Sequence, residues 1–250
     1  DFPQYEGRLA EVRQEMEVQG ISHALCISVN LADFPKVRRL AESYENFFAS
    51  VGVHPDQDPV TPGAATSETE LVELANHPKV LAIGETGLDY HWHKDAPEWQ
   101  RERFRIHIRA ARACGKPLVV HTRDAAADTL SIMREEGADK AGGVMHCFTE
   151  TLDMALAAME LNFFISFSGI VTFKNAKSIQ EVAKVVPLER MLVETDSPYL
   201  TPVPHRGKTN QPSYTRHVAE EIAKLKGISL EEVAAATTNN FFDLFKPALG

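Results

Sequence analysis

The stretch Leu81-Ala82-Ile83-Gly84-Glu85 decides the fold, because a short apolar run ends there in a glycine and a carboxylate. Short apolar runs bounded by glycine, proline or polar residues are typical of parallel strands that are buried on both faces. The same pattern recurs on either side of this stretch. The predicted strands are Ala24–Val29, Phe47–Val53, Val80–Ile83, Leu118–Val120, Val144–Phe148, Phe163–Phe167 and Met191–Val193.

Amphipathic segments with helical periodicity alternate with these runs. The predicted helices are Glu6–Gln19, Phe34–Glu45, Glu68–Asn76, Glu98–Cys114, Ala125–Glu136, Leu152–Glu160, Ala176–Val185, Thr215–Lys226, Leu230–Thr237 and Asn240–Phe245. Strands and helices that alternate without a break in composition predict one α/β domain over residues 1–250.

The number of strands points to one architecture. Seven strands in 250 residues, with a helix first, predict a TIM (β/α)8 barrel whose strand 1 lies upstream of Asp1 and is missing from the sequence shown. An open, doubly wound sheet is the alternative. Such a sheet normally carries a glycine-rich phosphate-binding turn after its first strand, and neither G-x-G-x-x-G nor a Walker A pattern occurs in this sequence.

Composition excludes several classes of protein. Of the 250 residues, 44% are hydrophobic and 24% are charged, a profile unlike that of disordered or low-complexity chains. Lys and Arg number 26 against 35 Asp and Glu, and the net charge of −9 argues against a broad basic face for nucleic acid. Three scattered cysteines favour the reducing cytoplasm over a disulfide framework. No apolar run approaches the roughly 18 residues of a membrane-spanning helix.

Polar side chains stand at the ends of four predicted strands. They are Glu85, His121, His146 and Asp196. In a barrel the carboxyl ends of the strands converge on one face, where such enzymes place their active sites. Imidazole and carboxylate groups together form the ligand set of zinc, manganese and iron-like divalent ions. The sequence therefore predicts a metal site at this face.

The segments around these residues resemble the signature segments of the TatD family of metal-dependent deoxyribonucleases. They are Gly84-Glu85-Thr86-Gly87-Leu88-Asp89, Val120-His121-Thr122-Arg123, Met145-His146-Cys147-Phe148, Glu194-Thr195-Asp196-Ser197-Pro198-Tyr199, Phe167-Ser168-Gly169 and the residues 204–210. The similarity extends over essentially the whole chain and is nearest to the bacterial TatD-like hydrolases. It implies an amidohydrolase-type TIM barrel with one or two divalent metal ions (Zn, Mg or Mn) that hydrolyses phosphodiesters.

The resemblance also implies roles for individual residues. Glu85 would bridge two metal positions, His121 and His146 would complete one of them, and Asp196 would bind the other. The expected catalytic residues are Glu85, as the bridging ligand, and Asp196. Asp196 is also placed to accept the proton of the attacking water. The family's His-x-His pair on strand 1 is absent here, and Asp1 matches the Asp that follows it. The segment 91–93, His-Trp-His, copies that spacing but falls in a predicted loop, which favours a place at the rim of the pocket.

Five further residues are candidates for binding substrate. His54 ends a predicted strand, and the family pattern includes a histidine there; a structural role is the alternative. The basic residues after the predicted strands that end in His121 and Asp196 suit phosphate oxygens, with a solvated basic loop as the alternative. They are Arg123, His205, Arg206 and Lys208. For Glu194 we expect a hydrogen-bonding role in the interior, because strand alternation points it the same way as Asp196.

These observations predict a metal-dependent hydrolase of ester bonds, a TatD-type deoxyribonuclease that uses metal-activated water. DNA or another phosphodiester is the expected partner, bound transiently, with no membrane association and no obligate protein partner. One alternative keeps the metal but changes the substrate to another ester, an amide or a lactone. The other is a barrel that binds metal or nucleotide without turnover, which applies if the chain truly starts at Asp1.

Overall fold

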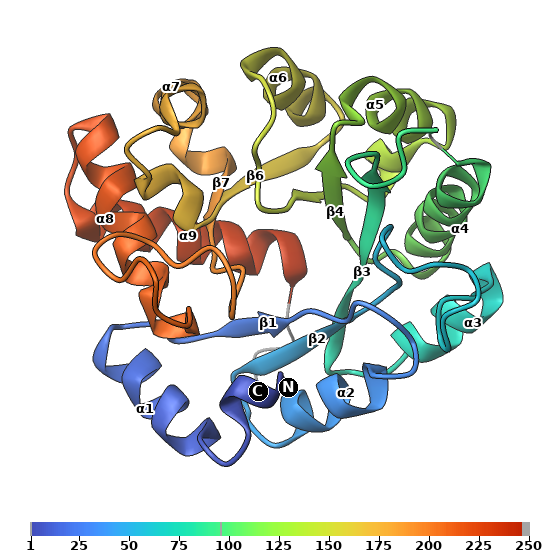
Figure 1. Cartoon of the computed structure of the whole chain (residues 1–250), viewed down its shortest axis with the longest axis horizontal. Coiled ribbons are helices and arrows are strands. Elements are labelled where there is room, and N and C mark those ends of the chain that lie inside the picture. The colour runs from blue at the N-terminus through green and yellow to red at the C-terminus, as the bar shows by residue number, and fades with distance from the viewer. Residues whose placement is uncertain (1, 96, 247–250) are drawn as a thin grey trace. The chain divides into compact units, whose positions relative to one another are not determined.

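The computed structural model describes residues 2–95 and 97–246 (Figure 1). The strands in these residues are β1 (Ala24–Cys26), β2 (Phe47–Val51), β3 (Val80–Asp89), β4 (Leu118–Arg123), β5 (Gly143–Met145), β6 (Phe163–Phe167) and β7 (Met191–Val193). The α-helices are α1 (Leu9–Val18), α2 (Phe34–Glu42), α3 (Glu68–Ala75), α4 (Glu98–Cys114), α5 (Ala126–Glu135), α6 (Leu152–Glu160), α7 (Lys177–Val185), α8 (Thr215–Lys226) and α9 (Leu230–Phe245). Short 3-10 turns are η1 (Pro3–Tyr5), η2 (Ala138–Lys140), η3 (Gly169–Thr172), η4 (Leu188–Arg190) and η5 (Pro212–Tyr214).

The strands follow one another in the sheet in chain order, from β1 to β7. Neighbouring strands pair in parallel from β1 through β5, and β6 pairs in parallel with β7. Each strand is joined to the next by at least one helix, as parallel pairing requires. The predicted set of seven parallel strands is therefore confirmed within the described residues.

The chain divides into two compact units. Among the described residues, the larger unit contains 24–95, 97–146, 157–164 and 242–246, and the smaller unit contains 2–23, 147–156 and 165–241. The expectation of a single domain over residues 1–250 stays a prediction.

In the larger unit, helices α2 to α5 lie on one side of strands β2 to β4 (Figure 1). All ten residues of β3 are buried, which is the pattern of a central parallel strand. On α4, Phe104 and Ile108 are fully buried and face the sheet side of the helix. Burying an aromatic or branched aliphatic side chain stabilises the fold by about 1.5–3 kcal/mol each, so this helix anchors β3.

Several boundaries differ from the expectation, among them those of β1, β2, β4 and β5, and two further differences concern β3 and α9. The predicted strand Val80–Ile83 continues to Asp89, so Glu85 lies inside β3 and not at its end. The two predicted helices at the C-terminus are one helix, α9. Thr237, at the expected break, donates its hydroxyl proton to the Val233 carbonyl, and the Asn240 side chain donates to two carbonyls near β7. Thr237 is thus hydrogen-bonded within a continuous helix, and Asn240 ties that helix to the residues around the start of β7.

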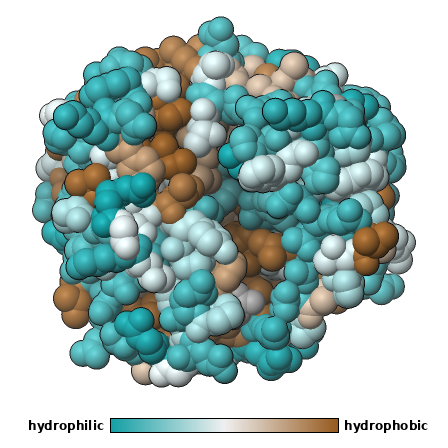
Figure 2. Space-filling model, viewed as in Figure 1, coloured by the Kyte–Doolittle hydropathy of each residue, from teal (hydrophilic) through white to brown (hydrophobic). Residues whose placement is uncertain are grey.

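In the smaller unit, α8 packs against α7 and η3, and a long segment from Glu194 to Tyr214 connects β7 to α8. No helix in the described part of the chain combines the length and apolar character of a membrane span. Figure 2 shows one face of the molecule, on which hydrophilic side chains predominate and apolar ones occur in small groups.

Candidate metal centre

A cluster of three histidines around one carboxylate lies in the larger unit. Oε1 of Glu85 is 3.5 Å from Nε2 of His54, 3.3 Å from Nδ1 of His121 and 3.5 Å from Nε2 of His146. Ligand atoms of His54, Glu85 and His121 all lie within 4.8 Å of one another, a spacing suited to one metal ion. We call these four residues the histidine–glutamate cluster. It brings together three of the four predicted metal ligands, Glu85, His121 and His146.

Two glycines let β3 carry Glu85 to this place. Gly84 has φ +145°, and a Cβ there would lie 2.5 Å from the Val119 carbonyl oxygen of β4. Gly87 has φ +129° and pairs with His121, whose carbonyl oxygen would collide with a Cβ at Gly87. Only glycine combines such a backbone conformation with so close an approach. The two glycines therefore allow the strand that holds Glu85 to run close to the strand that holds His121.

The ring of His121 is held between two carboxylates. Its Nδ1 faces Glu85, and its Nε2 lies 3.0 Å from Oδ2 of Asp89. Asp89 is itself fixed, because its Oδ1 accepts a hydrogen bond of 2.9 Å from the backbone N–H of His91. Burial on its own would lower the pKa of His121, but the hydrogen bonds to Asp89 and Glu85 outweigh it and raise this pKa to about 9.

The position of His54 depends on a histidine of α4. The backbone N–H of Val53 donates to Nε2 of His107 at 3.0 Å, and Nδ1 of His107 donates to the Arg103 carbonyl at 2.8 Å. These two bonds assign the tautomer of a fully buried, neutral ring, and burial lowers the pKa of His107 to about 4. The ring of His54 lies edge-on to that of His121, with centroids 4.6 Å apart. His54 was expected near substrate, and the structure places it within the cluster.

The charge state of the cluster fits a divalent metal ion. Burial would raise the pKa of Glu85, but the three neighbouring imidazoles outweigh it and hold this pKa below its usual range, so the carboxylate is ionised. When Asp89 accepts the proton of His121 Nε2, the lone pair on Nδ1 of the neutral ring faces the ionised Glu85 oxygen at 3.3 Å. Two electron-rich atoms at that distance need a proton or a cation between them. The donor set of imidazole and carboxylate is the one that zinc and its neighbours prefer.

Sequence reasoning did not single out Asp89 as a site residue. Two signals could have found it, since it closes the quoted segment 84–89 and lies two residues after Gly87 on the same strand face. Carboxylates that hold the second nitrogen of a ligating histidine fix its orientation and raise its basicity. Asp89 has this position relative to His121.

Glu194 has the interior hydrogen-bonding role that was expected. In the smaller unit its carboxylate accepts from the Cys147 backbone N–H at 3.1 Å and from the Ser166 hydroxyl. Cys147 has φ +43°, a left-handed conformation that is uncommon for a residue other than glycine. Glu194 therefore stabilises the turn that comes directly after His146.

The remaining predicted residues lie apart from these contacts or in the other unit. Arg123 is exposed at the end of β4. Burial would raise the pKa of Asp89, but the hydrogen bonds from His121 and His91 and, less strongly, the charge of Arg123 lower it. Arg206 donates to the Thr201 carbonyl at 3.0 Å and stacks 4.0 Å above the Phe173 ring. Other members of this group are Asp196, which is half-buried after β7, Lys208, which is exposed, and His205, which contacts His217. Their roles stay predictions.

The segment 91–93 is a loop, as expected. His91 lies 3.2 Å from Asp124 and His93 lies 3.9 Å from Asp56, and the side chain of Trp92 is largely exposed. The loop thus follows Asp89 at the rim of the cluster without joining it among the described residues. Asp1, the match to the family's trailing Asp, lies outside the described residues.

Comparison with known proteins gives a consistent result. Residues 1–246 match the family model described as TatD related DNase. The chain is 45% identical to the "uncharacterized metal-dependent hydrolase YcfH" of Escherichia coli K12, over 98% of this chain and 91% of the relative. It is 31% identical to the "3'-5' ssDNA/RNA exonuclease TatD" of Escherichia fergusonii, over 90% and 88%.

Solved structures agree with the fold. The crystal structure of YJJV, a TatD homolog from E. coli K12, matches with a TM-score of 0.88 at 25% identity, over 98% of this chain and 95% of that one. An uncharacterized amidohydrolase from Saccharomyces cerevisiae matches with a TM-score of 0.75 at 18% identity, over 94% and 91%, and so shows the fold alone. The predicted fold class, an α/β chain of the TIM-barrel type, is confirmed.

Proposed function

The chain belongs to the TatD related DNase family and is a metal-dependent hydrolase, and from that premise we propose that it cleaves phosphodiester bonds in DNA. The observation that carries the proposal is the convergence of three imidazole nitrogens on Oε1 of Glu85. This is a ligand set for the kind of ion that catalyses phosphodiester hydrolysis. The name of the E. fergusonii relative, an exonuclease of single-stranded DNA and RNA, supports nucleic acid as the substrate class.

In this proposal Glu85, His121 and His146 hold a divalent metal ion, with His54 beside them. Such an ion, one or two per chain, supplies Lewis acidity that makes water nucleophilic at neutral pH and offsets the charge of the phosphodiester. The residues of the chain prepare the ligands. Asp89 holds the Nε2 proton of His121, so the lone pair of Nδ1 is presented to the ion.

Proton transfer and substrate binding are assigned to other residues. Asp196 accepts the proton of the attacking water, a task for which a carboxylate is suited. Arg123, exposed after β4, binds a phosphate oxygen of the DNA. In the smaller unit, His205, Arg206 and Lys208 also bind phosphate oxygens. With a net charge of −9, the chain holds DNA through a few such contacts and releases it after cleavage.

The proposed location is the cytoplasm. In the described part of the chain Cys26, Cys114 and Cys147 are not joined in disulfide bonds, which suits a reducing compartment.

The experiment that tests the function is a metal-supplemented cleavage assay on the full chain. Glu85→Ala and His121→Ala are compared with His77→Ala, which changes a half-buried histidine after α3 that lies 3.1 Å from Glu42, outside the cluster. Labelled single-stranded DNA, duplex DNA and a panel of small esters and lactones serve as substrates, with Zn, Mg or Mn added after chelation.

We expect DNA cleavage by the wild type and by His77→Ala, with a loss of at least about a hundredfold in the two cluster variants. Full DNA cleavage by either cluster variant would contradict the site. Cleavage of a small ester or lactone without cleavage of DNA would contradict DNA as the substrate. It would still agree with metal-dependent hydrolysis at this site.

A further inference from the structure

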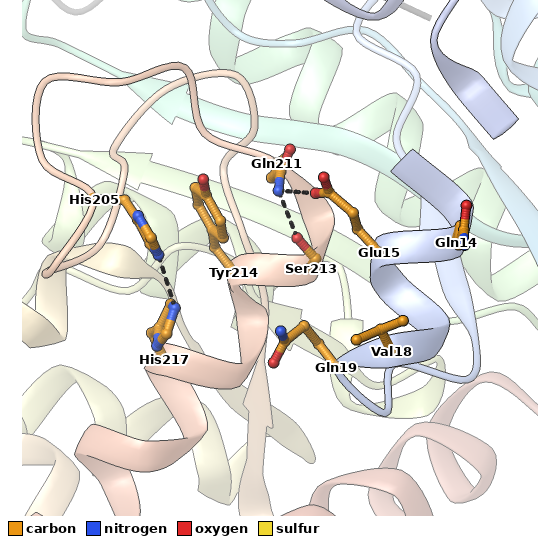
Figure 3. A pocket seen from close by; sticks show the side chains of 9 residues that line it. All are labelled: Gln14, Glu15, Val18, Gln19, His205, Gln211, Ser213, Tyr214 and His217. Atoms are coloured by element: carbon orange, nitrogen blue, oxygen red, sulfur yellow. Dashed lines mark hydrogen bonds between the residues drawn. The ribbon is translucent and has the colours of Figure 1, made fainter. Parts of the chain in front are cut away.

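A pair of histidines faces a pocket in the smaller unit that shares no residue with the histidine–glutamate cluster. The pocket, of about 380 Å³, lies between α1 and the segment that runs from His205 to His217 at the start of α8 (Figure 3). Nε2 of His205 and Nε2 of His217 point toward each other and are 3.1 Å apart. The proposed hydrolysis uses His205 only as a phosphate-binding residue and assigns no role to His217 or to the contact between the two rings.

Both rings are held in place from the side away from their shared contact. Nδ1 of His217 lies 2.9 Å from Oε2 of Glu220, and the other oxygen of Glu220 accepts from Arg216 at 2.9 Å. His205 is stacked on Tyr214, with ring centroids 4.2 Å apart and ring planes 8° from parallel. A carboxylate on the second nitrogen of a histidine and a fixed ring plane are the supports found around ligating histidines.

These supports determine what can lie between the two Nε2 atoms. Because Glu220 accepts the proton of His217 Nδ1, the Nε2 of a neutral His217 carries a lone pair on the side of the ring that faces His205. The contact is therefore closed either by a proton on His205 Nε2 or by a cation that both lone pairs share. At the usual Zn–N distance of about 2.0–2.1 Å, nitrogens 3.1 Å apart subtend about 95–102° at the ion. This angle lies between the octahedral and the tetrahedral value.

We propose that His205 and His217 bind a second divalent ion of the zinc type, with Glu220 as the positioning carboxylate of His217. The carboxylate of Glu15, which lines the same pocket and accepts from Gln211, adds negative charge to it. The pocket leaves room for water molecules to complete the coordination shell. Two imidazoles and oxygen donors suit zinc, nickel and copper better than magnesium or calcium.

A bound ion would connect two segments of the smaller unit. His205 belongs to the long segment after β7, and His217 belongs to α8, so a shared ion would tie the segment to the helix. The tied segment includes Arg206 and Lys208, which are both exposed. The ion would thereby order the part of the chain that carries these two cations, without itself taking part in hydrolysis.

The test is a zinc titration of the full chain by calorimetry, with the bound metal counted by mass spectrometry after desalting. A background variant, His121→Ala with His146→Ala, removes two of the three proposed ligands of the histidine–glutamate cluster. We expect this background to retain one zinc ion and to lose it when His217→Ala is added. We also expect Glu220→Gln to weaken this zinc about 10–100-fold, whereas Glu221→Gln, on a neighbouring residue paired with Lys224, leaves the affinity unchanged.

The proposal is overturned if the background binds no zinc, or if His217→Ala leaves its zinc in place, because the histidines then share only a proton. Should the background variant fail to fold, the count is made on the wild type against His217→Ala alone, and equal zinc content in the two overturns the proposal. DNA cleavage is not the readout. Failure of the proposed nuclease activity and failure of the proposed zinc site at His205 and His217 are therefore distinguishable.

Discussion

Replacing His107 with glutamine should remove about 2 kcal/mol of the pH dependence of folding stability between about pH 7.5 and pH 5. The ring of His107 is fully buried, accepts from the Val53 N–H and donates to the Arg103 carbonyl, and it has no carboxylate partner among its hydrogen bonds. A glutamine amide can keep the acceptor for Val53 but cannot titrate.

The magnitude follows from the two pKa values. Burial lowers the pKa of His107 from 6.5 to about 4 in the folded chain, whereas the unfolded chain keeps the ordinary value. Above the unfolded pKa both states are neutral. As the pH falls from about 6.5 toward 4, the unfolded state binds a proton that the folded state refuses, so stability is lost over this window. The full loss is about 3 kcal/mol, and about 2 kcal/mol of it has accrued by pH 5.

Urea unfolding at the two pH values measures this difference. The difference in unfolding free energy between wild type and His107→Gln should shrink by about 2 kcal/mol on going from pH 7.5 to pH 5. The other titrating groups contribute equally in the two proteins, so their contributions cancel in this difference. The control is Ile108→Val, on the next buried residue of α4, which should cost about 0.5–1.5 kcal/mol at both pH values. A gap for His107→Gln that is the same at both pH values would refute the buried, neutral ring and with it this account of how Val53 is held.

Two further predictions concern β3. Asp89→Asn should weaken binding of zinc at the histidine–glutamate cluster about 10–100-fold, because the charge that holds His121 Nε2 is lost; calorimetric titration measures it, and an unchanged affinity would remove Asp89 from the site. Gly87→Ala should destabilise the fold by at least about 2 kcal/mol in urea unfolding, because its Cβ meets the His121 carbonyl, whereas Gly20→Ala, with open space around its Cβ, should cost only about 1 kcal/mol. Equal costs for the two glycines would contradict the close approach of β3 and β4.

The sequence predicted the larger features because they depend on local pattern. Buried parallel strands are short apolar runs, and β6 and β7 have the bounds that were expected. Chemistry in this fold gathers where strands end, and that rule alone selected Glu85, His121 and His146. The structure brings His121 and His146 to one carboxylate oxygen of Glu85.

The extent of β3 could not be predicted, for a physical reason. Gly84 interrupts the apolar run, and a glycine inside a strand pattern normally signals its end or a bulge. Here the strand continues, because Gly84 and Gly87 occupy conformations in which β3 approaches β4 too closely for any side chain. That requirement comes from a strand more than thirty residues away, and local periodicity carries no trace of it.

The side chains of the histidine–glutamate cluster could be predicted from local sequence, whereas the residues that hold them in place could not. A ligand at the end of a predicted strand can be identified from the sequence, because a polar group there has no packing role to explain it. Its supports cannot, because they are polar groups in places where several explanations compete. His107 lies on a helix and looks like an ordinary core residue, yet it anchors the backbone next to His54. Asp89 looks like the first residue of a loop, yet it sets the tautomer of His121. Since misplacing a ligating group by about 1 Å is enough to impair a site, the part of the site that the sequence hides is the part that fixes its geometry.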